Sequence, residues 1–444
     1  MGQRRFWKKM SSFQFIIAGF LAVILAGTLL LSLPIAGKTG RWTPLEDALF
    51  TAASAVCVTG LVVRDTASAW SGFGQAVILL LIQIGGLGIV SVTALFATLS
   101  GKRISLRQRS MLQESISAHQ LGGVVRMTGF LFRVAFLTEA AGAVIMAPTF
   151  CARFGPRGIW MAVFHSVSAF CNAGFDIMGT STGAFSSLTG VGTSLGIVIP
   201  VCLLIVVGGI GFLTWDDVAE HRFHLRRYRM QSKAILTVTA VLILVPAAAF
   251  FFSDFSAHGM KERLCLSLFQ AITPRTAGFN TADLASMSSA GRALTIVLML
   301  IGGSPGSTAG GMKTTTVAVL LATAAAVFRR RKNPQLFGRR IEDQTVRSAS
   351  ALLIMYLSLA LAGAFAISVA EGLPFSVCVF ETASAIGTVG LSHGITPSVG
   401  TLSHLILIVL MFLGRAGGLT VMFAAVRSNG SEVAQRPVEK INVG

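Results

Sequence analysis

The sequence predicts an all-α integral membrane protein of four helix–pore loop–helix units around a pseudo-fourfold axis, with eight spanning helices and four re-entrant pore helices. Three observations carry this prediction: an apolar composition, eight apolar runs of spanning length, and a glycine-centred motif that occurs four times. Of the 444 residues, 53% are hydrophobic and only 12% are charged, about half the charged share usual in soluble domains. Since a spanning helix needs about 20 mostly apolar residues, the composition supports eight spans and argues against a soluble enzyme.

The apolar runs follow a regular order of long, short, long. The long runs lie near residues 13–35, 73–99, 123–147, 192–215, 232–252, 293–328, 345–370 and 401–426. The short segments lie within each pair of long runs, near 44–57, 158–171, 260–273 and 374–386. Because these segments are too short to cross a bilayer, we expect each to be a re-entrant pore helix. The pairs divide the chain into units at 1–110, 111–220, 221–340 and 341–444, the last with the C-terminal tail.

The chain has a formal net charge of +18, and many of its basic residues lie in four clusters beside apolar runs. The clusters are Arg4, Arg5, Lys8 and Lys9; Lys102, Arg103, Arg107 and Arg109; Arg222, Arg226, Arg227, Arg229 and Lys233; and Arg329, Arg330, Arg331, Lys332, Arg339 and Arg340. Cytoplasmic loops carry such an excess, so we expect the amino terminus and three linkers on the cytoplasmic side of the cell membrane. This topology explains the charge without a nucleic-acid partner, whose groove would need interleaved aromatic residues.

A motif that ends in glycine marks each short segment. Gly60, Gly174 and Gly390 each follow a phenylalanine by ten positions, and Gly278 follows Phe269 by nine. Such matched spacing indicates four copies of one unit. Because each unit has two spans, all four units begin on the same side of the membrane, which predicts an axis along the membrane normal.

The tripeptides that end in these glycines are the candidate ion-selecting residues. They are Val58-Thr59-Gly60, Asn172-Ala173-Gly174, Thr276-Ala277-Gly278 and Thr388-Val389-Gly390. We expect each pore helix to point its carboxyl end inward, where the helix dipole favours a cation, and each tripeptide to offer carbonyl oxygens that replace an ion's water shell. The tripeptides hold no carboxylate, which favours a monovalent alkali cation. The competing interpretation is that the glycines only allow close helix packing.

A glycine-rich stretch, residues 302–316, interrupts the sixth apolar run. Its candidate gate residues are Gly302, Gly303, Ser304, Pro305, Gly306, Gly310, Gly311 and Lys313. Five glycines and a proline do not sustain a regular helix, so we expect a loop below the filter that blocks the path and moves aside. Lys313 either adds charge at the lower mouth or extends toward the cytoplasm. Arg415, in the eighth run, either latches this loop through its carbonyls or belongs to a structural salt bridge.

The same stretch contains two enzyme-like patterns. Residues 306–314 resemble a phosphate-binding loop, but Met312 separates Gly311 from Lys313 and no strand precedes them, so we reject that interpretation. Residues 302–306 fit the Gly-x-Ser-x-Gly nucleophile pattern. With Ser304 as nucleophile and His404 as base, an intramembrane serine protease is the alternative function. It leaves the fourfold repeat unexplained.

Taken together, these segments resemble the Ktr/Trk/HKT superfamily of potassium transporters. Residues 54–61, 168–175, 276–280 and 386–392 are similar to its filter segments, residues 302–316 to its intramembrane gating loop, and Arg415 to the basic residue of its last helix. The tail at 436–444 is similar to the ending of the Ktr membrane subunits, the KtrB group, and the two extra amino-terminal spans of Trk-type members are absent.

The resemblance implies a transporter rather than an enzyme, with K⁺ as the transported ion and Na⁺ as a second candidate ion. It also implies a homodimer in the lipid bilayer on a cytoplasmic ring of nucleotide-binding, KtrA-like subunits. Gly60 fits the potassium-transporting pattern, because some relatives that favour sodium have serine at that position.

Overall fold

The computed structural model describes residues 11–100, 104, 106–116, 124–222 and 224–418. The residues 1–10, Lys102, Arg103 and the tail beyond residue 418, on which several predictions fall, lie outside this range. The α-helices are α2 Ser12–Ser32, α3 Leu45–Val56, α4 Thr66–Ala69, α5 Gly72–Leu87, α6 Ile89–Leu99, α7 Leu106–Ile116, α8 Val124–Phe154, α9 Arg157–Phe170, α10 Gly179–Thr182, α11 Leu195–Gly209, α12 Phe212–His221, α13 Met230–Phe252, α14 Met260–Ile272, α15 Ser289–Leu300, α16 Thr314–Phe328, α17 Asp343–Glu371, α18 Phe375–Gly387 and α19 Thr401–Ala416. Short 3₁₀ turns cover Thr189–Val191, Leu225–Arg227, Leu284–Ser286 and Thr396–Ser398.

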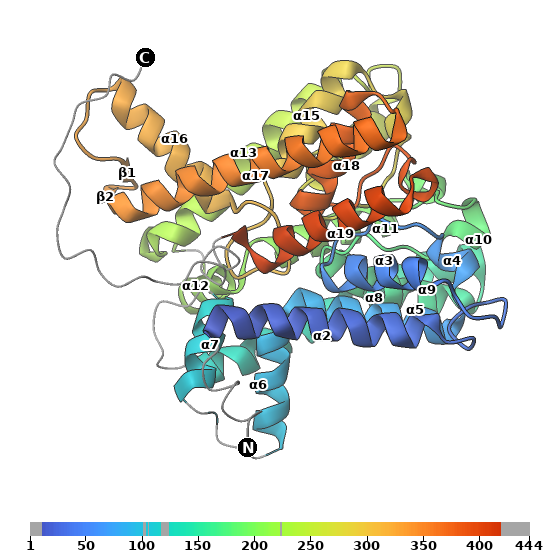
Figure 1. Cartoon of the computed structure of the whole chain (residues 1–444). Helices are drawn as coiled ribbons and strands as arrows, with labels where there is room; N and C mark the ends of the chain where they lie inside the picture. Colours follow the sequence, from blue (N-terminus) through green and yellow to red (C-terminus); the bar gives the residue numbers. More distant parts are fainter. Residues whose placement is uncertain (1–10, 101–103, 105, 117–123, 223, 419–444) are drawn as a thin grey trace.

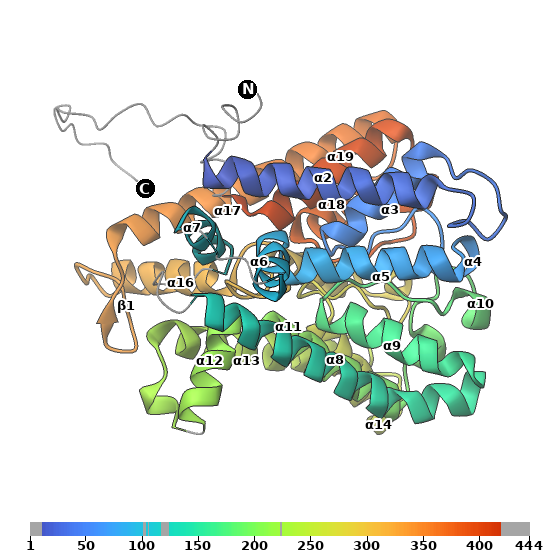
Figure 2. The ribbon, with the colours of Figure 1, turned by 90° about the horizontal axis from the view of Figure 1, so that it is seen from below.

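Four long helices coincide with the first long run of each expected unit. They are α2, α8, α13 and α17, with 21, 31, 23 and 29 residues. All four are long and apolar enough to cross a membrane. Their outer sides carry large exposed apolar residues such as Leu244 on α13, as helices that contact lipid require. Figure 1 shows α3 beside α2, and Figure 2 shows α9 beside α8.

The second spans of the first two units are bent, so the apolar runs near 73–99 and 192–215 are not single straight helices as expected. The α5–α6 pair bends by 94° at Gly88, and the α11–α12 pair bends by 97° near Gly211. Gly88 and Gly211 have φ of +84° and +90°, which glycine adopts without a steric penalty. The third pair, α15 and α16, is separated by the glycine-rich loop, and α19 ends at Gly417, also with φ of +84°. If each bent pair counts as one span, the described residues contain six spans by length and composition.

A second repeat, not recognised in the sequence, explains where these helices break. The carboxyl ends of α5, α11 and α19 each carry an equivalent group of four residues. The groups are Gly85-Gly86-Leu87-Gly88, Gly208-Gly209-Ile210-Gly211 and Gly414-Arg415-Ala416-Gly417. The first glycine of each group lies against a backbone carbonyl at the end of its own unit's pore helix: Val56, Phe170 and Ile386. A side chain at those glycines would push the two helices apart. Arg415 therefore replaces a glycine in the fourth copy.

The four short segments form the expected helices, α3, α9, α14 and α18. The phenylalanine that begins each motif is almost completely buried: Phe50, Phe164 and Phe269 are 0% exposed and Phe380 is 1% exposed. The residue after each glycine, Leu61, Phe175, Phe279 and Leu391, is likewise at most 1% exposed. Each pore loop is thus anchored by an apolar side chain on both sides, which accounts for the regular spacing of the motif.

The linker between the third and fourth units contains a two-stranded hairpin that is not predicted from the sequence. Strands β1 Gln335–Leu336 and β2 Arg339–Arg340 pair antiparallel, and Leu336 and Ile341 pack with Val319 of α16 and Ala349 of α17. The hairpin holds the basic residues of this linker at the end of α16, where Arg339 and Arg340 are exposed.

Candidate functional site

The four motif glycines lie in a closed ring at the centre of the molecule. A Cβ atom added to Gly60 would lie 2.6 Å from the carbonyl oxygen of Ala173, and one added to Gly174 would lie 2.8 Å from that of Ala277. The same construction places Gly278 against the oxygen of Val389, and Gly390 against that of Thr59. Each glycine therefore touches the next loop in the order 60, 174, 278, 390 and back to 60. The ring leaves no room for a side chain at any of the four positions.

The backbone of each tripeptide alternates in conformation. The first residues, Val58, Asn172, Thr276 and Thr388, have φ between +51° and +67°, and the glycines have φ between +68° and +94°. A β-branched residue at positive φ is strained, and three of these first residues are β-branched. In an ordinary strand successive carbonyls point to opposite sides. When the sign of φ changes from one residue to the next, as in these tripeptides, neighbouring carbonyls can face the same side. Strain of this kind persists where the surrounding structure fixes the backbone.

Hydroxyl groups at the carboxyl ends of the pore helices fix this backbone. Gly60 N–H donates to Ser54 Oγ (3.1 Å) and Gly390 N–H donates to Ser384 Oγ (3.0 Å). In the other two units the hydroxyl donates instead: Ser168 Oγ to the Phe175 carbonyl and Thr273 Oγ1 to the Phe279 carbonyl, both at 2.7 Å. These four hydroxyl residues, Ser54, Ser168, Thr273 and Ser384, are not among the predicted site residues. Their signal is a hydroxyl six residues before the glycine, or five in the shortened third motif.

The side chains of the first residues differ among the units. The Asn172 amide is best satisfied when its nitrogen donates to the carbonyls of Ala169 (2.9 Å) and Ile205 (3.2 Å). Its oxygen then faces the hydroxyl of Thr276 in the neighbouring loop. The hydroxyl of Thr388 lies against Gly310 of the glycine-rich loop. Val58 has no polar side-chain atom, so three of the four first residues carry a polar side chain.

The glycine-rich loop lies directly beneath the pore loops. Ser304 N–H donates to the Gly209 carbonyl (2.9 Å), and Thr308 Oγ1 donates to the carbonyl of Phe170, the last residue of α9 (3.0 Å). Gly311 N–H donates to the Gly414 carbonyl on α19 (3.3 Å). The loop therefore contacts the second helices of two other units as well as the fourth pore loop.

Two cationic side chains bind the carbonyls of this loop. Arg415 donates to the carbonyl oxygens of Thr308, Gly85 and Gly86, the last at 2.9 Å. Lys313 Nζ donates back to the carbonyls of Ala309 (2.9 Å) and Gly310 (3.4 Å). Neither residue forms an ion pair with a carboxylate among the described residues. Arg415 thus joins the loop to the end of α5 that carries Gly85 and Gly86, and Lys313 folds back over its own loop.

The residues of the protease alternative are not brought together. Ser304 Oγ is 3.0 Å from Thr314 Oγ1. Both ring nitrogens of His404 are engaged elsewhere, Nδ1 with Glu46 Oε1 (2.7 Å) and Nε2 with the carbonyl of Thr396 (2.8 Å). No hydrogen bond joins Ser304 to His404 in the described part of the chain. Without a base in reach the serine is not activated.

The buried acids near the pore loops serve the scaffold. Glu139 of α8 accepts from Gln83 Nε2 of α5 at 3.0 and 3.1 Å, which joins two units. Glu381 of α18 accepts from Ser392 Oγ (2.6 Å), Thr396 Oγ1 (3.0 Å) and the backbone N–H of His393 (2.9 Å). Over the described residues, no group of three or more His, Cys, Asp or Glu side chains is placed to hold a metal ion.

Four re-entrant loops that meet at a backbone ring, within a shell of apolar helices, define a pore-loop membrane transport protein. The family of the TrkH cation transport proteins matches residues 3–434, and the chain belongs to this family. The potassium/sodium uptake protein NtpJ of Enterococcus hirae is 38% identical over 100% of this chain and 99% of its own length. The Ktr system potassium uptake protein B of Bacillus subtilis is 37% identical over 96% of each chain.

A solved structure has the same fold. The crystal structure of the potassium transporter TrkH from Vibrio parahaemolyticus superposes with a TM-score of 0.73, covering 92% of this chain and 85% of that one at 19% identity. The predicted fold class is thereby confirmed. Family membership also places the chain among cation transporters rather than enzymes, and gives no support to the serine protease alternative.

Proposed function

We propose that this protein takes up potassium across the cell membrane through the ring of the four tripeptides. The observation that carries the proposal is the cyclic contact of Gly60, Gly174, Gly278 and Gly390. Each pore helix ends within a few residues of this ring, so four negative dipole ends point at one place. Backbone carbonyls at the ring supply neutral oxygen ligands, which suit a dehydrated alkali ion. The names of the relatives, potassium/sodium uptake protein and potassium uptake protein, support K⁺ as substrate and Na⁺ as a second ion.

In this proposal the loop at 302–316 is the gate. Its backbone fills the space under the fourth pore loop, because Gly310 touches Thr388 and Gly311 is hydrogen-bonded to Gly414. Arg415 and Lys313 hold the closed loop by neutralising its carbonyl dipoles. Among the described residues, the hydrogen bonds of Arg415 all go to main-chain oxygens, so release of the loop would leave no buried carboxylate unpaired.

The proposed setting is a multi-pass protein of the cell membrane with its amino terminus and basic linkers on the cytoplasmic side. The exposed arginines of the hairpin and of the α12–α13 linker support this orientation. We further propose a homodimer regulated by a cytoplasmic nucleotide-binding ring. The name of the Ktr relatives describes them as parts of a system, and the basic linkers would face such a ring.

The test is rubidium uptake into proteoliposomes that contain the purified protein, with K⁺ or Na⁺ as competitor. We expect uptake that K⁺ inhibits much more strongly than Na⁺, and the Gly60→Ser variant to lose most of this discrimination because its Cβ would press on the Ala173 carbonyl. Gly40→Ser is the matched control: Gly40 also has a positive φ of +66° but meets no atom within 4 Å. Unchanged selectivity in folded Gly60→Ser would remove the filter assignment.

A further inference from the structure

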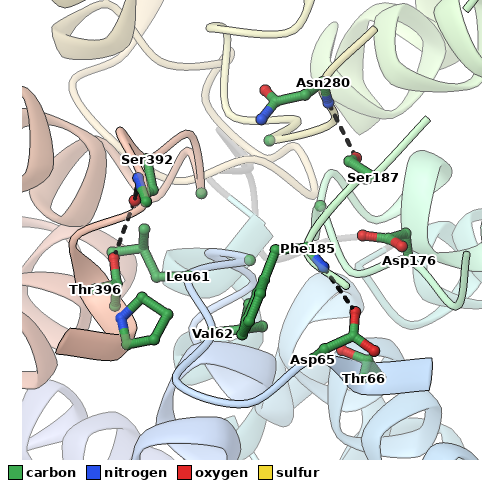
Figure 3. A pocket seen from close by; sticks show the side chains of 16 residues that line it. Leu61, Val62, Asp65, Thr66, Asp176, Phe185, Ser187, Asn280, Ser392 and Thr396 are labelled. Atoms are coloured by element: carbon green, nitrogen blue, oxygen red, sulfur yellow. Dashed lines mark hydrogen bonds between the residues drawn. The ribbon is translucent and has the colours of Figure 1, made fainter. Parts of the chain in front are cut away.

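The side of the glycine ring opposite the gate loop opens into a cavity of about 300 Å³. All four ring glycines line its floor. Its walls come from the segments that follow each glycine and include Val62, Asp65, Asp176, Asn280, Ser392 and Thr396 (Figure 3). An ion that enters the proposed pore from outside must cross this cavity before it meets the ring.

Two carboxylates face the cavity, but the structure uses them differently. Asp65 is buried, and both its oxygens accept backbone N–H groups: Oδ2 from Ser68 (2.8 Å) and Oδ1 from Phe185 (3.1 Å). It therefore caps α4 and fixes the segment around Phe185. Asp176 accepts one bond, at Oδ1 from the N–H of Met178 (3.0 Å), and within the described residues its other oxygen has no hydrogen-bond donor. Figure 3 shows the Asp176 carboxylate directed into the cavity.

The other charged groups around the cavity are committed to partners. Arg64, beside Asp65 in the sequence, is paired with Asp47 at 2.5 Å. Glu381 lies behind the cavity wall and is bound by Ser392, Thr396 and the His393 N–H. The His393 ring packs on Phe380 and does not line the cavity. No Lys or Arg lines the cavity within the described chain, so the charge of Asp176 is not neutralised there.

We propose that Asp176 is a cation-attracting residue of the outer mouth, whose negative charge draws monovalent cations into the cavity above the glycine ring. This inference rests on the proposed uptake function. A fixed charge in a narrow, low-dielectric mouth raises the local concentration of the opposite ion and so the rate of entry. The ring then discriminates among ions that Asp176 has already concentrated. Its contribution therefore appears in the apparent KM for the ion rather than in the choice between K⁺ and Na⁺.

The proposal also predicts a dependence of uptake on external pH. Burial raises the pKa of Asp176 to about 6, although the hydrogen bond from Met178 opposes the rise, and the nearby charge of Asp65 adds to it. The carboxylate is therefore charged near neutral pH and becomes neutral as the external pH falls through about 6. Uptake at low ion concentration should decline over the same interval.

The experiment measures rubidium uptake by the full-length protein in proteoliposomes, as a function of rubidium concentration and external pH. Asp176→Asn keeps an acceptor for the Met178 N–H and removes only the charge. We expect its KM to rise about threefold to tenfold, its Vmax to stay within about twofold, and its pH dependence between about 7.5 and 5 to disappear. Asp176→Glu should restore both a low KM and a pH dependence. Glu262→Gln, which removes an exposed charge beside another cavity, should behave like the wild type.

Two failures are distinguishable. If the wild type moves no rubidium, the proposed function fails and the inference with it. If the wild type moves rubidium but Asp176→Asn has the same KM and pH profile, the inference alone is overturned. A fall in Vmax with unchanged KM in Asp176→Asn, uncorrected by Asp176→Glu, would likewise overturn it, because that pattern indicates a purely structural role.

Discussion

The guanidinium of Arg415 donates a hydrogen bond to the main-chain carbonyl of Thr308, so the end of the last described helix holds the loop that interrupts the sixth span. The same side chain binds Gly85 and Gly86 at the carboxyl end of α5. One residue thereby connects the first, third and fourth units beneath the glycine ring. A planar guanidinium can do this because it presents several donors in fixed directions.

Replacing Arg415 should loosen the loop. We expect Arg415→Gln to raise basal rubidium flux several-fold, since an amide of this length cannot reach carbonyls on both sides. The flux of Arg415→Lys should lie between those of the wild type and Arg415→Gln, because lysine keeps the positive charge but lacks the several donors of the planar guanidinium. Flux is measured in proteoliposomes with protein that elutes as a single peak. The exposed Arg329→Gln is the control, and lower flux in well-folded Arg415→Gln would contradict the latch.

Removing the loop should increase flux further. Deletion of residues 303–310 joins Gly302 to Gly311, and these ends are already adjacent: Gly302 N–H donates to the Met312 carbonyl (2.8 Å), and a Cβ on Gly302 would lie 3.0 Å from Gly311 Cα. The deletion should therefore close without straining α15 or α16. Equal or lower flux from a folded deletion variant would show that the loop is not a barrier.

Ser304→Ala is the matched control inside the loop. It removes one hydroxyl that meets Thr314 but leaves the backbone contacts in place. We expect potassium-dependent growth of a host that lacks other potassium uptake to be retained at close to the wild-type rate. Loss of growth with a folded, membrane-inserted protein would assign the hydroxyl a role that the contacts do not suggest.

The ring predicts different outcomes for two glycines with similar backbones. Gly278 has φ of +76° and touches the Val389 oxygen, whereas Gly372, which ends α17, has φ of +67° and meets no atom within 4 Å. Alanine at Gly372 should cost about 1 kcal/mol from backbone strain alone and leave transport intact. Alanine at Gly278 adds a collision with the next loop, so selective uptake should be lost. Thermal unfolding and competition by Na⁺ check both variants, and equal behaviour would argue against a closed ring.

The hydroxyls behind the ring should affect stability and selectivity together. Ser384→Ala leaves the buried N–H of Gly390 without its acceptor, at a cost of about 1 to 3 kcal/mol. We expect a lower Tm and a lower preference for K⁺ over Na⁺. Ser398→Ala, an exposed hydroxyl in the same unit, is the control. A Ser384→Ala protein identical to the wild type in both measurements would mean that the pore loop does not depend on this bond.

The pore helices and the ring could be predicted because the motif repeats, and repetition marks positions that share one environment. The four glycines needed no knowledge of distant contacts. The partners of Arg415 did, since Gly85 lies 330 positions away along the chain and no local pattern connects them. The helix breaks could be predicted only in part. The glycine groups at 85–88, 208–211 and 414–417 were visible, but apolar composition on both sides of Gly88 and Gly211 suggested continuous spans.

The bends at Gly88 and Gly211 determine how a movement of α6 or α12 would affect the rest of the molecule. A straight helix transmits a force along its axis. Because these helix pairs bend by 94° and 97°, a force along α6 or α12 acts sideways on α5 or α11. A force applied to α6 or α12 would therefore reach the glycine groups at the ends of α5 and α11 from the side, next to the ends of the pore helices α3 and α9.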